Sequence, residues 1–362
     1  GLAQEEQAGP GWARPATARA LLAARQPAAA GRTLESLVLD QPTCIDALDT
    51  LGRLQVEQGQ LRAAAGTYRR AADVTRGSIV RLQRHGLLAW YAGLREEAVR
   101  PLERVAVLGA ESAMLDPQAL VLLVACRAEQ RDLKGLQRAL DVLQVAAARL
   151  PDPARAARLA AVAGVYGLVA HRLADEARAA LAAWTPRLLD PTLDVETACN
   201  LLTLWSVLAA TGGPLPDDTA LAVDTLATRF AASRALGALL AGAASPHPPF
   251  AARVQAAQQR VAAESEQAVA AALQGHPGEA VASLHALADA TRNVRFVDLA
   301  RLTLQRHRDH IADDRAEALA ASLERLQAVL EPVGGPPARG HAARLRTPGR
   351  GGPAGRGRCV RR

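Results

Sequence analysis

The sequence predicts an all-α protein built from pairs of helices that repeat along the chain. Alanine, leucine and arginine dominate its 362 residues, aromatic residues make up 3%, and the alternation typical of a half-buried strand is absent. The segment from Ile45 to Ala110 also matches itself when it is shifted so that Gly52 falls on Gly86. A fixed period of about 34 residues is typical of solenoids, in which helix pairs stack and no single core limits the length. We therefore expect an elongated helical scaffold.

Small and turn-forming residues anchor this repeat. Gly52 and Ala64 let two helix backbones approach closely, and Tyr68 is the large residue that fills the space beside them. Gly59 lies where the first helix must end, because glycine takes a left-handed conformation without a steric cost. One pair cannot bury its apolar face alone, so neighbouring pairs must stack. The shift aligns five pairs of residues: Gly52 with Gly86, Gly59 with Gly93, Ala64 with Ala98, Tyr68 with Leu102, and Ala71 with Val105.

This pattern resembles the tetratricopeptide repeat family. Residues 45–78 match the family's small and aromatic positions well, and the next copy matches less well because His85 replaces a leucine. Gln55 and Ala89 also depart from the pattern, since the family favours an aromatic residue there. The resemblance implies a right-handed solenoid of antiparallel helix pairs, with three repeats in residues 12–112. An ordinary alanine-rich helical bundle is the alternative.

Helix starts and breaks divide the rest of the chain. Asp116-Pro117 combines an aspartate N-cap with a proline at the first helical position, which is a helix-start signal, and Asp152-Pro153 repeats it. The proline-rich stretch at 245–249 is the strongest internal break. The expected organisation is a disordered N-terminus (1–11), three repeats (12–112), divergent helical hairpins (113–244), C-terminal helical repeats (245–331), and a disordered tail rich in arginine, glycine and proline (332–362).

The net charge of +7 comes from the end of the chain. The last acidic residue is Glu331, and eight arginines follow from Arg339 onward, so the rest of the chain carries a net charge of −1. An argument for nucleic-acid binding from a basic composition therefore does not apply to the folded part. The tail leaves an alternative function open, in which the protein associates with nucleic acid through its arginines. A solubilising tail is the plainer interpretation, because the tail has no aromatic residues for base stacking.

The sequence lacks the residue clusters that enzymes need. Lys134 is the only lysine and has no glycine-rich loop before it, which excludes a P-loop and a lysine-dependent kinase. No nucleophile elbow, zinc-protease helix or dinucleotide-binding glycine motif is present. His307, His310 and Asp314 could share one helical face and bind a metal, although a solvated polar face explains the same residues. We expect no enzyme activity, cofactor or metal, and a helical enzyme is the least favoured alternative.

Cysteine spacing and hydropathy indicate a cytoplasmic protein. Cys44, Cys126, Cys199 and Cys359 are widely separated and form no paired or zinc-binding motif. Cys126 and Cys199 lie in apolar helical stretches, where cysteine usually acts as a small hydrophobic residue. No apolar run approaches the roughly 20 residues that span a bilayer. We expect neither a membrane partner nor a small-molecule substrate.

The resemblance also implies where a partner binds. In tetratricopeptide arrays, ligand peptides lie in a concave groove lined by the first helix of each pair. Carried over by position, the groove residues are Asp46, Asp49, Arg53, Gln83, Leu87, Trp90 and Tyr91. Asp49 and Arg53 replace residues with which some family members hold a terminal carboxylate, which disfavours that mode. We expect a protein or peptide partner anchored by Trp90 or Tyr91, and a scaffold role, as the interaction region of a larger bacterial signalling or regulatory protein.

Overall fold

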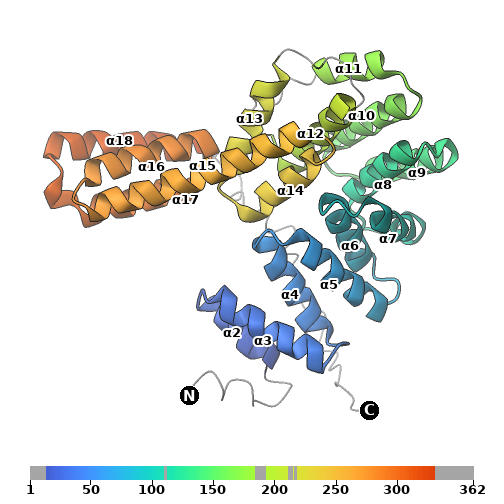
Figure 1. Cartoon of the computed structure of the whole chain (residues 1–362), viewed down its shortest axis with the longest axis horizontal. Coiled ribbons are helices and arrows are strands. Elements are labelled where there is room, and N and C mark those ends of the chain that lie inside the picture. Colours follow the sequence, from blue (N-terminus) through green and yellow to red (C-terminus); the bar gives the residue numbers. More distant parts are fainter. Residues whose placement is uncertain (1–13, 110–111, 184–192, 211–214, 216–217, 331–362) are drawn as a thin grey trace. The chain divides into compact units, whose positions relative to one another are not determined.

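Helices form all of the regular structure in the described part of the chain (Figure 1). The computed structural model describes residues 14–109, 112–183, 193–210, 215 and 218–330. These residues contain no strand, and within each of the two compact units the consecutive helices contact one another. The predicted all-α fold class is therefore confirmed. The disorder expected for the N-terminus and for the arginine-rich tail lies outside the described residues.

The described helices fall into two compact units. The first unit ends at Leu173 and the second begins at Ala174, inside the segment expected to hold divergent hairpins. No division falls at 245–249, where the sequence suggests a boundary. There, α14 (Arg234–Ala244) packs directly against α15 (Pro248–Leu273) within the second unit. The prolines at this position restart a helix and do not separate two units.

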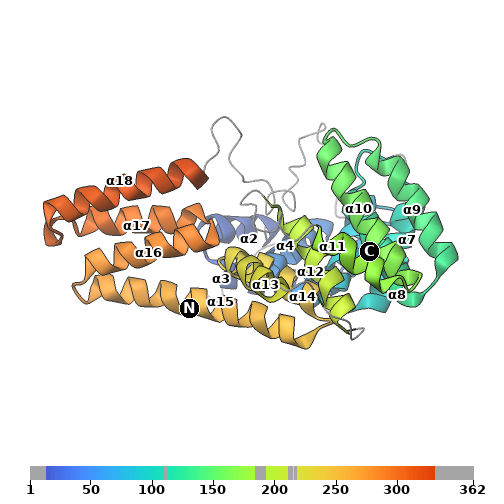
Figure 2. The same ribbon diagram turned by 90° about the horizontal axis from the view of Figure 1, so that it is seen from above.

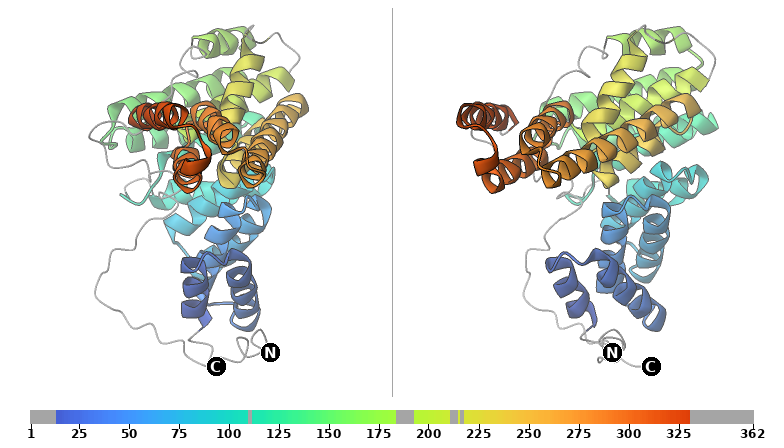
Figure 3. Two further views of the ribbon diagram at one scale, coloured as in Figure 1. Left: turned by 90° about the vertical axis from the view of Figure 1, so that its left-hand side faces the viewer. Right: turned by 60° about the vertical axis from the view of Figure 1, so that its left-hand side comes forward.

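The first unit is a series of helix pairs in which the two helices of a pair contact each other and each pair contacts the next (Figure 3). The first helices of the two clear repeats, α4 and α6, begin and end at residues that the shift aligns, and their second helices also begin at aligned residues. The period of the sequence is therefore the period of the structure. The helices are α2 (Arg14–Ala23), α3 (Pro27–Asp40), α4 (Ile45–Glu57), α5 (Leu61–Val74), α6 (Ile79–Tyr91), α7 (Arg95–Gly109), α8 (Pro117–Gln130), α9 (Leu133–Ala147) and α10 (Pro153–Ala170).

Gly52 and Gly86 leave room for a large side chain of the partner helix in two successive pairs. A Cβ atom added at Gly52 would lie 2.7 Å from the Tyr68 ring, and one added at Gly86 would lie 2.6 Å from the Leu102 side chain. Both distances are too short for carbon atoms in van der Waals contact. Ala64, the other small residue of the pattern, is fully buried. The residues that the shift aligns therefore make equivalent contacts.

Gly59 and Gly93 end the first helix of their pairs in the same conformation. Both have a φ angle of +76°, in the left-handed region that favours glycine. After the first of these glycines, the backbone N–H of Gln60 donates to the carbonyl oxygen of Gln55 at 2.8 Å. This bond, which closes a loop back to the last turn of the helix, is the mark of a Schellman cap.

Arginine occupies the same left-handed position in three other turns of the first unit. Arg25, Arg131 and Arg172 have φ angles of 57°, 55° and 62°. The equivalent capping bond is present, because the N–H of Asp132 donates to the carbonyl oxygen of Arg127 at 3.0 Å. A residue with a Cβ atom is strained in this conformation by about 1–2 kcal/mol. The turn geometry of the repeat is thus retained where the sequence has lost its glycine.

We expect Arg131→Gly to raise the free energy of unfolding by about 1 kcal/mol, because glycine relieves the left-handed strain at a modest cost in backbone entropy. Arg138→Gly is the matched control, since Arg138 is exposed in the middle of α9 and glycine in a helix interior costs about 1 kcal/mol. Urea unfolding measures both variants. Equal destabilisation by the two substitutions would contradict the assignment of Arg131 to a left-handed cap.

The second unit ends in four helices that pack side by side, α15 to α18 (Figure 2). Their shared core includes the fully buried side chains of Leu284, Val297 and Leu323. Besides α14 and α15, the second unit contains α11 (Ala174–Ala182), α12 (Val195–Ala210), α13 (Thr219–Phe230), α16 (Pro277–Thr291), α17 (Val294–Arg306) and α18 (Asp313–Leu330), with a 3₁₀ turn at Arg308–His310. The helices before α15 also make extensive contacts with helices two positions along the chain, α12 with α14 and α13 with α15.

Candidate functional site

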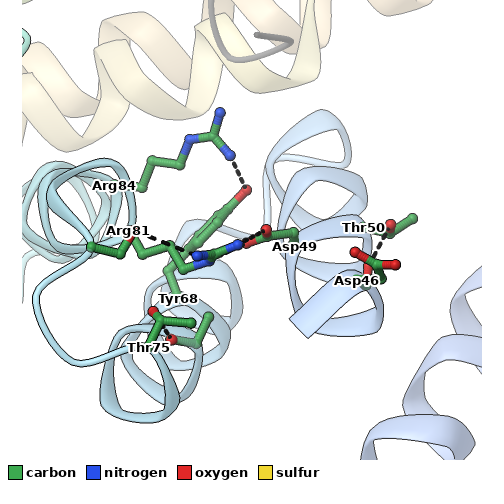
Figure 4. A network of polar contacts seen from close by, with 9 residues as sticks. Asp46, Asp49, Thr50, Tyr68, Thr75, Arg81 and Arg84 are labelled. Carbon is green, nitrogen blue, oxygen red and sulfur yellow. Dashed lines mark hydrogen bonds and ion pairs between the residues drawn. The ribbon is translucent and has the colours of Figure 1, made fainter. Parts of the chain in front are cut away.

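An ion pair joins the first helices α4 and α6 on the face where we expect a partner to bind (Figure 4). Arg81 Nη2 lies 2.6 Å from Asp49 Oδ2, and Arg81 Nε donates to Asp49 Oδ1 at 3.1 Å. Both side chains are half-buried, so solvent screens this pair less than it screens a fully exposed one. Asp49, one of the predicted groove residues, therefore connects two repeats.

Gln83 and Tyr91 connect α6 to the following helix pair. Gln83 Nε2 donates to the carbonyl oxygen of Met114 at 3.3 Å, and Gln83 Oε1 accepts from the backbone N–H of Asp116 at 3.1 Å. The Tyr91 hydroxyl accepts from Gln118 Nε2 at 3.3 Å. These two predicted groove residues hold successive repeats in register, and their polar groups are engaged by the protein itself.

Trp90 is buried, so its predicted role as an exposed anchor is wrong. Its exposed fraction is 0%, and that of its neighbour Tyr91 is 6%. The Arg95 guanidinium lies over the Trp90 ring, 3.8 Å from the ring centre, and its Nη1 atom lies 2.9 Å from Glu129 Oε1 of the next pair. A cation held over an aromatic face stabilises the contact. Trp90 thus belongs to the core, and neither aromatic residue presents a surface to a partner.

Three predicted groove residues remain accessible. Asp46 is exposed, and Arg53 and Leu87 are half-buried at equivalent positions of α4 and α6. Within the described residues, no carboxylate forms an ion pair with Arg53. Arg53 therefore differs from Arg81, whose positive charge is neutralised by Asp49.

Arg84 belongs to this face as well, although sequence reasoning missed it. Its Nη1 atom donates to the Tyr68 hydroxyl at 3.2 Å, and its guanidinium carbon lies 5.5 Å from the centre of the Tyr68 ring (Figure 4). Burial raises the pKa of the Tyr68 hydroxyl above its usual value, and the charges of Arg84 and Arg53 oppose that rise. The hydroxyl consequently stays protonated at neutral pH. The signal available in the sequence was Gly52, which leaves room for the Tyr68 ring beside α4.

His85, the departure from the family's leucine, is buried and contacts Glu97 of the second helix in its own pair. Its Nε2 atom lies 3.2 Å from Glu97 Oε1, which also accepts from Arg69 Nη1 at 3.0 Å. Burial lowers the pKa of the imidazole below its usual value, and this effect outweighs the opposing influence of Glu97. Arg69 adds to the lowering and Asp73 opposes it. His85 is therefore neutral in the folded protein at pH 7.

We expect the free energy of unfolding to fall as the pH drops from 7.5 to 5.5, by at most about 1.4 kcal/mol per pH unit from this group. The folded-state pKa of His85 lies below that of an unfolded histidine, so the unfolded chain takes up the proton first and is favoured at lower pH. His85→Leu should flatten this dependence without lowering stability at pH 7.5. His171→Leu, at an exposed histidine, is the matched control for the substitution itself.

The described residues offer little else that is reactive. They hold no group of three His, Cys, Asp or Glu side chains suited to a metal ion. His307, His310 and Asp314 do not share one helical face, because α17 ends at Arg306 and Asp314 belongs to α18. Burial raises the pKa of the Cys126 thiol to about 12, which leaves it protonated and unreactive.

Comparison with known proteins adds no identification. No family model matches the chain, and no curated protein matches it. None of the helices in the described ranges combines the length and the hydropathy that a membrane span requires. The contacts on the α4–α6 face therefore carry the functional interpretation.

Proposed function

We propose that the first unit is a tetratricopeptide-like, right-handed solenoid that acts as a non-enzymatic scaffold for a protein or peptide partner. The support is the equivalence of its two clear pairs, which share helix bounds, a left-handed turn and a glycine contact at the positions that the shift aligns. Solenoids of this kind present a continuous face built from the same position of successive repeats. The proposed setting is the cytoplasm, as the interaction region of a larger bacterial regulatory protein.

The observation that carries the proposal is that some side chains on the α4–α6 face hold the repeats together while others remain accessible. Asp49 and Gln83 make contacts between repeats, whereas Arg53 forms no ion pair with a carboxylate of the described residues and Leu87 keeps part of its apolar surface accessible. The inter-repeat contacts hold α4 and α6 in fixed register, so the accessible side chains are pre-organised for binding. Pre-organisation lowers the entropy that binding would otherwise cost.

Selection of linear peptides from a display library by the full chain tests this proposal. Peptides that bind the native protein should bind Arg53→Glu and Leu87→Asp at least about tenfold more weakly, because these changes remove a charged and an apolar contact. Arg62→Glu is the matched control, since Arg62 is exposed on α5 outside this face. Equal binding to all three variants would show that the α4–α6 face is not the binding surface.

A further inference from the structure

The second helices of the first unit expose large aliphatic side chains at one end. In α3, α5, α7 and α9 alike, the last turn carries at least one such residue. The first helices of these pairs, α2, α4, α6 and α8, are described over their full length, and none of them exposes a large hydrophobic residue. A single exposed aliphatic residue is ordinary, but recurrence at the same end of four successive second helices is not. The residues are Leu39 (77% exposed), Val74 (40%), Val107 (81%), Leu108 (48%) and Val145 (48%).

Arginines accompany three of these aliphatic residues on the same side of the helix. Each of the three follows an exposed arginine by seven residues, which is close to two full helical turns. None of the described residues forms an ion pair or a hydrogen bond with these arginine side chains. Their charge is therefore left to solvent or to a partner. The pairs are Arg32 with Leu39 on α3, Arg100 with Val107 on α7, and Arg138 with Val145 on α9.

The exposed side of the second helices is basic as a whole. The exposed residues of α3, α5, α7 and α9 include eight arginines and lysines and five aspartates and glutamates. One of the five, Asp40, is neutralised by Arg14. On α5, Gly66 and Asp73 occupy the positions of the arginine and the aliphatic residue, but that helix adds Arg62 to the charge. Because equivalent positions of stacked pairs line up, the exposed residues of α3, α5, α7 and α9 form one surface, the second-helix face, which combines aliphatic side chains with positive charge.

The chemistry of the second-helix face fits an anionic lipid surface better than another protein. The extensive contacts of the second helices are with first helices and not with one another, so the aliphatic side chains protrude singly from separate helices. A protein interface needs a closely complementary apolar core, whereas the headgroup region of a bilayer deforms around single apolar side chains. Guanidinium groups form paired hydrogen bonds with phosphate, and anionic lipids attract basic surfaces.

We propose that the second-helix face binds the surface of an anionic phospholipid membrane. The aliphatic side chains enter the headgroup region, and Arg32, Arg100 and Arg138 bind lipid phosphates. This face is built from second helices and the α4–α6 face from first helices, so membrane binding is a function in addition to peptide binding. The expectation that the protein has no membrane partner came from the lack of a long apolar run, which concerns helices that span a bilayer and not surfaces that lie on one.

Sedimentation of the full chain with liposomes tests the proposal. We expect binding to an equal mixture of phosphatidylcholine and phosphatidylglycerol, and at least about tenfold weaker binding to phosphatidylcholine alone. A variant that removes the charge should bind the mixed liposomes at least about tenfold more weakly, because each arginine near the surface contributes to the attraction. A variant that removes the aliphatic groups should show a similar loss, because less apolar area leaves water. The two variants are Arg32→Gln, Arg100→Gln and Arg138→Gln combined, and Leu39→Ser, Val107→Ser and Val145→Ser combined.

Matched controls carry the same kinds of substitution at exposed residues of the second unit. Both controls should bind the mixed liposomes like the native chain. All of the substituted residues are exposed, so all four variants should keep the native melting temperature, which circular dichroism checks. The controls are Arg295→Gln, Arg306→Gln and Arg325→Gln combined, and Leu221→Ser, Leu273→Ser and Leu302→Ser combined.

Several outcomes would overturn the membrane surface while leaving the peptide scaffold intact. Absent binding, or equal binding to the neutral and the mixed liposomes, would contradict it directly. A loss with the arginine variant but not with the aliphatic variant would show adsorption by charge alone, without insertion. Self-association of the native chain that both variants abolish, measured by sedimentation velocity without lipid, would make the second-helix face an interface between copies of the chain. Binding of labelled single-stranded RNA in place of liposomes, lost in the arginine variant, would assign the face to nucleic acid.

Discussion

Trp90→Ala is expected to lower the free energy of unfolding by about 3–5 kcal/mol, the usual cost of removing a large buried aromatic side chain. Trp90 is a fully buried residue of α6, and the Arg95 guanidinium lies over its ring. Its removal leaves a cavity and also leaves Arg95 without the aromatic face on which it lies. Thermal and urea unfolding of the full chain measure the effect.

Trp90→Phe and Leu87→Ala are the controls for this result. Phenylalanine keeps most of the volume, and the Trp90 indole N–H has no hydrogen-bond partner among the described residues, so its loss costs nothing there. Leu87 lies one turn earlier on α6 and is half-buried, so its truncation should destabilise the protein much less. An unchanged melting temperature for Trp90→Ala combined with lost peptide binding would restore Trp90 as an exposed anchor.

The local design of the repeat was predictable because it depends on residues close in sequence. Gly59 ends its helix in a left-handed conformation, and Gly52 lies against the Tyr68 ring within the same helix pair. Asp116 and Asp152 cap their helices through backbone N–H groups two residues ahead. Helix starts, turns and close contacts of this kind follow from conformational preference and spacing alone.

The exposure of the site residues was not predictable, because it depends on contacts with neighbouring pairs. Arg95 and Glu129 belong to different helix pairs, and together they decide that Trp90 is covered. Gln55 offers a second example. It stands where the family favours an aromatic residue, is buried, and accepts from Thr67 Oγ1 at 2.8 Å. A family position describes where a side chain projects, but its neighbours decide whether it reaches solvent.

The same reasoning explains why Arg84 was missed. The family's groove positions on α6 include Gln83 and Leu87, and Arg84 lies between them in sequence. Its role depends on Tyr68, which comes from the second helix of the preceding pair. Gly52 of α4 leaves room for the Tyr68 ring of α5, and α6 then places Arg84 against that ring. The sequence pattern of a single helix therefore does not predict the contact between Arg84 and Tyr68.

Ala64→Arg is expected to destabilise the protein by about 3 kcal/mol or more, because it forces a charged side chain into a fully buried position. Ala64 is the small residue of α5 that the shift between repeats aligns with Ala98, and both are fully buried. Because Ala64 has no exposed surface, the longer side chain cannot reach solvent from this position without displacing its neighbours. The repeat must open locally to accommodate it.

Ala63→Arg provides the control, since it places the same side chain one residue earlier in the same helix at an exposed position. Exposed substitutions of this kind usually change stability by no more than about 0.5 kcal/mol. The pair of variants therefore separates burial from helix propensity and from net charge, which are the same in both. Comparable melting temperatures for the two would mean that the face of α5 toward α4 is assigned incorrectly. That result would also remove the basis for placing Tyr68, four residues after Ala64, between Gly52 and Arg84.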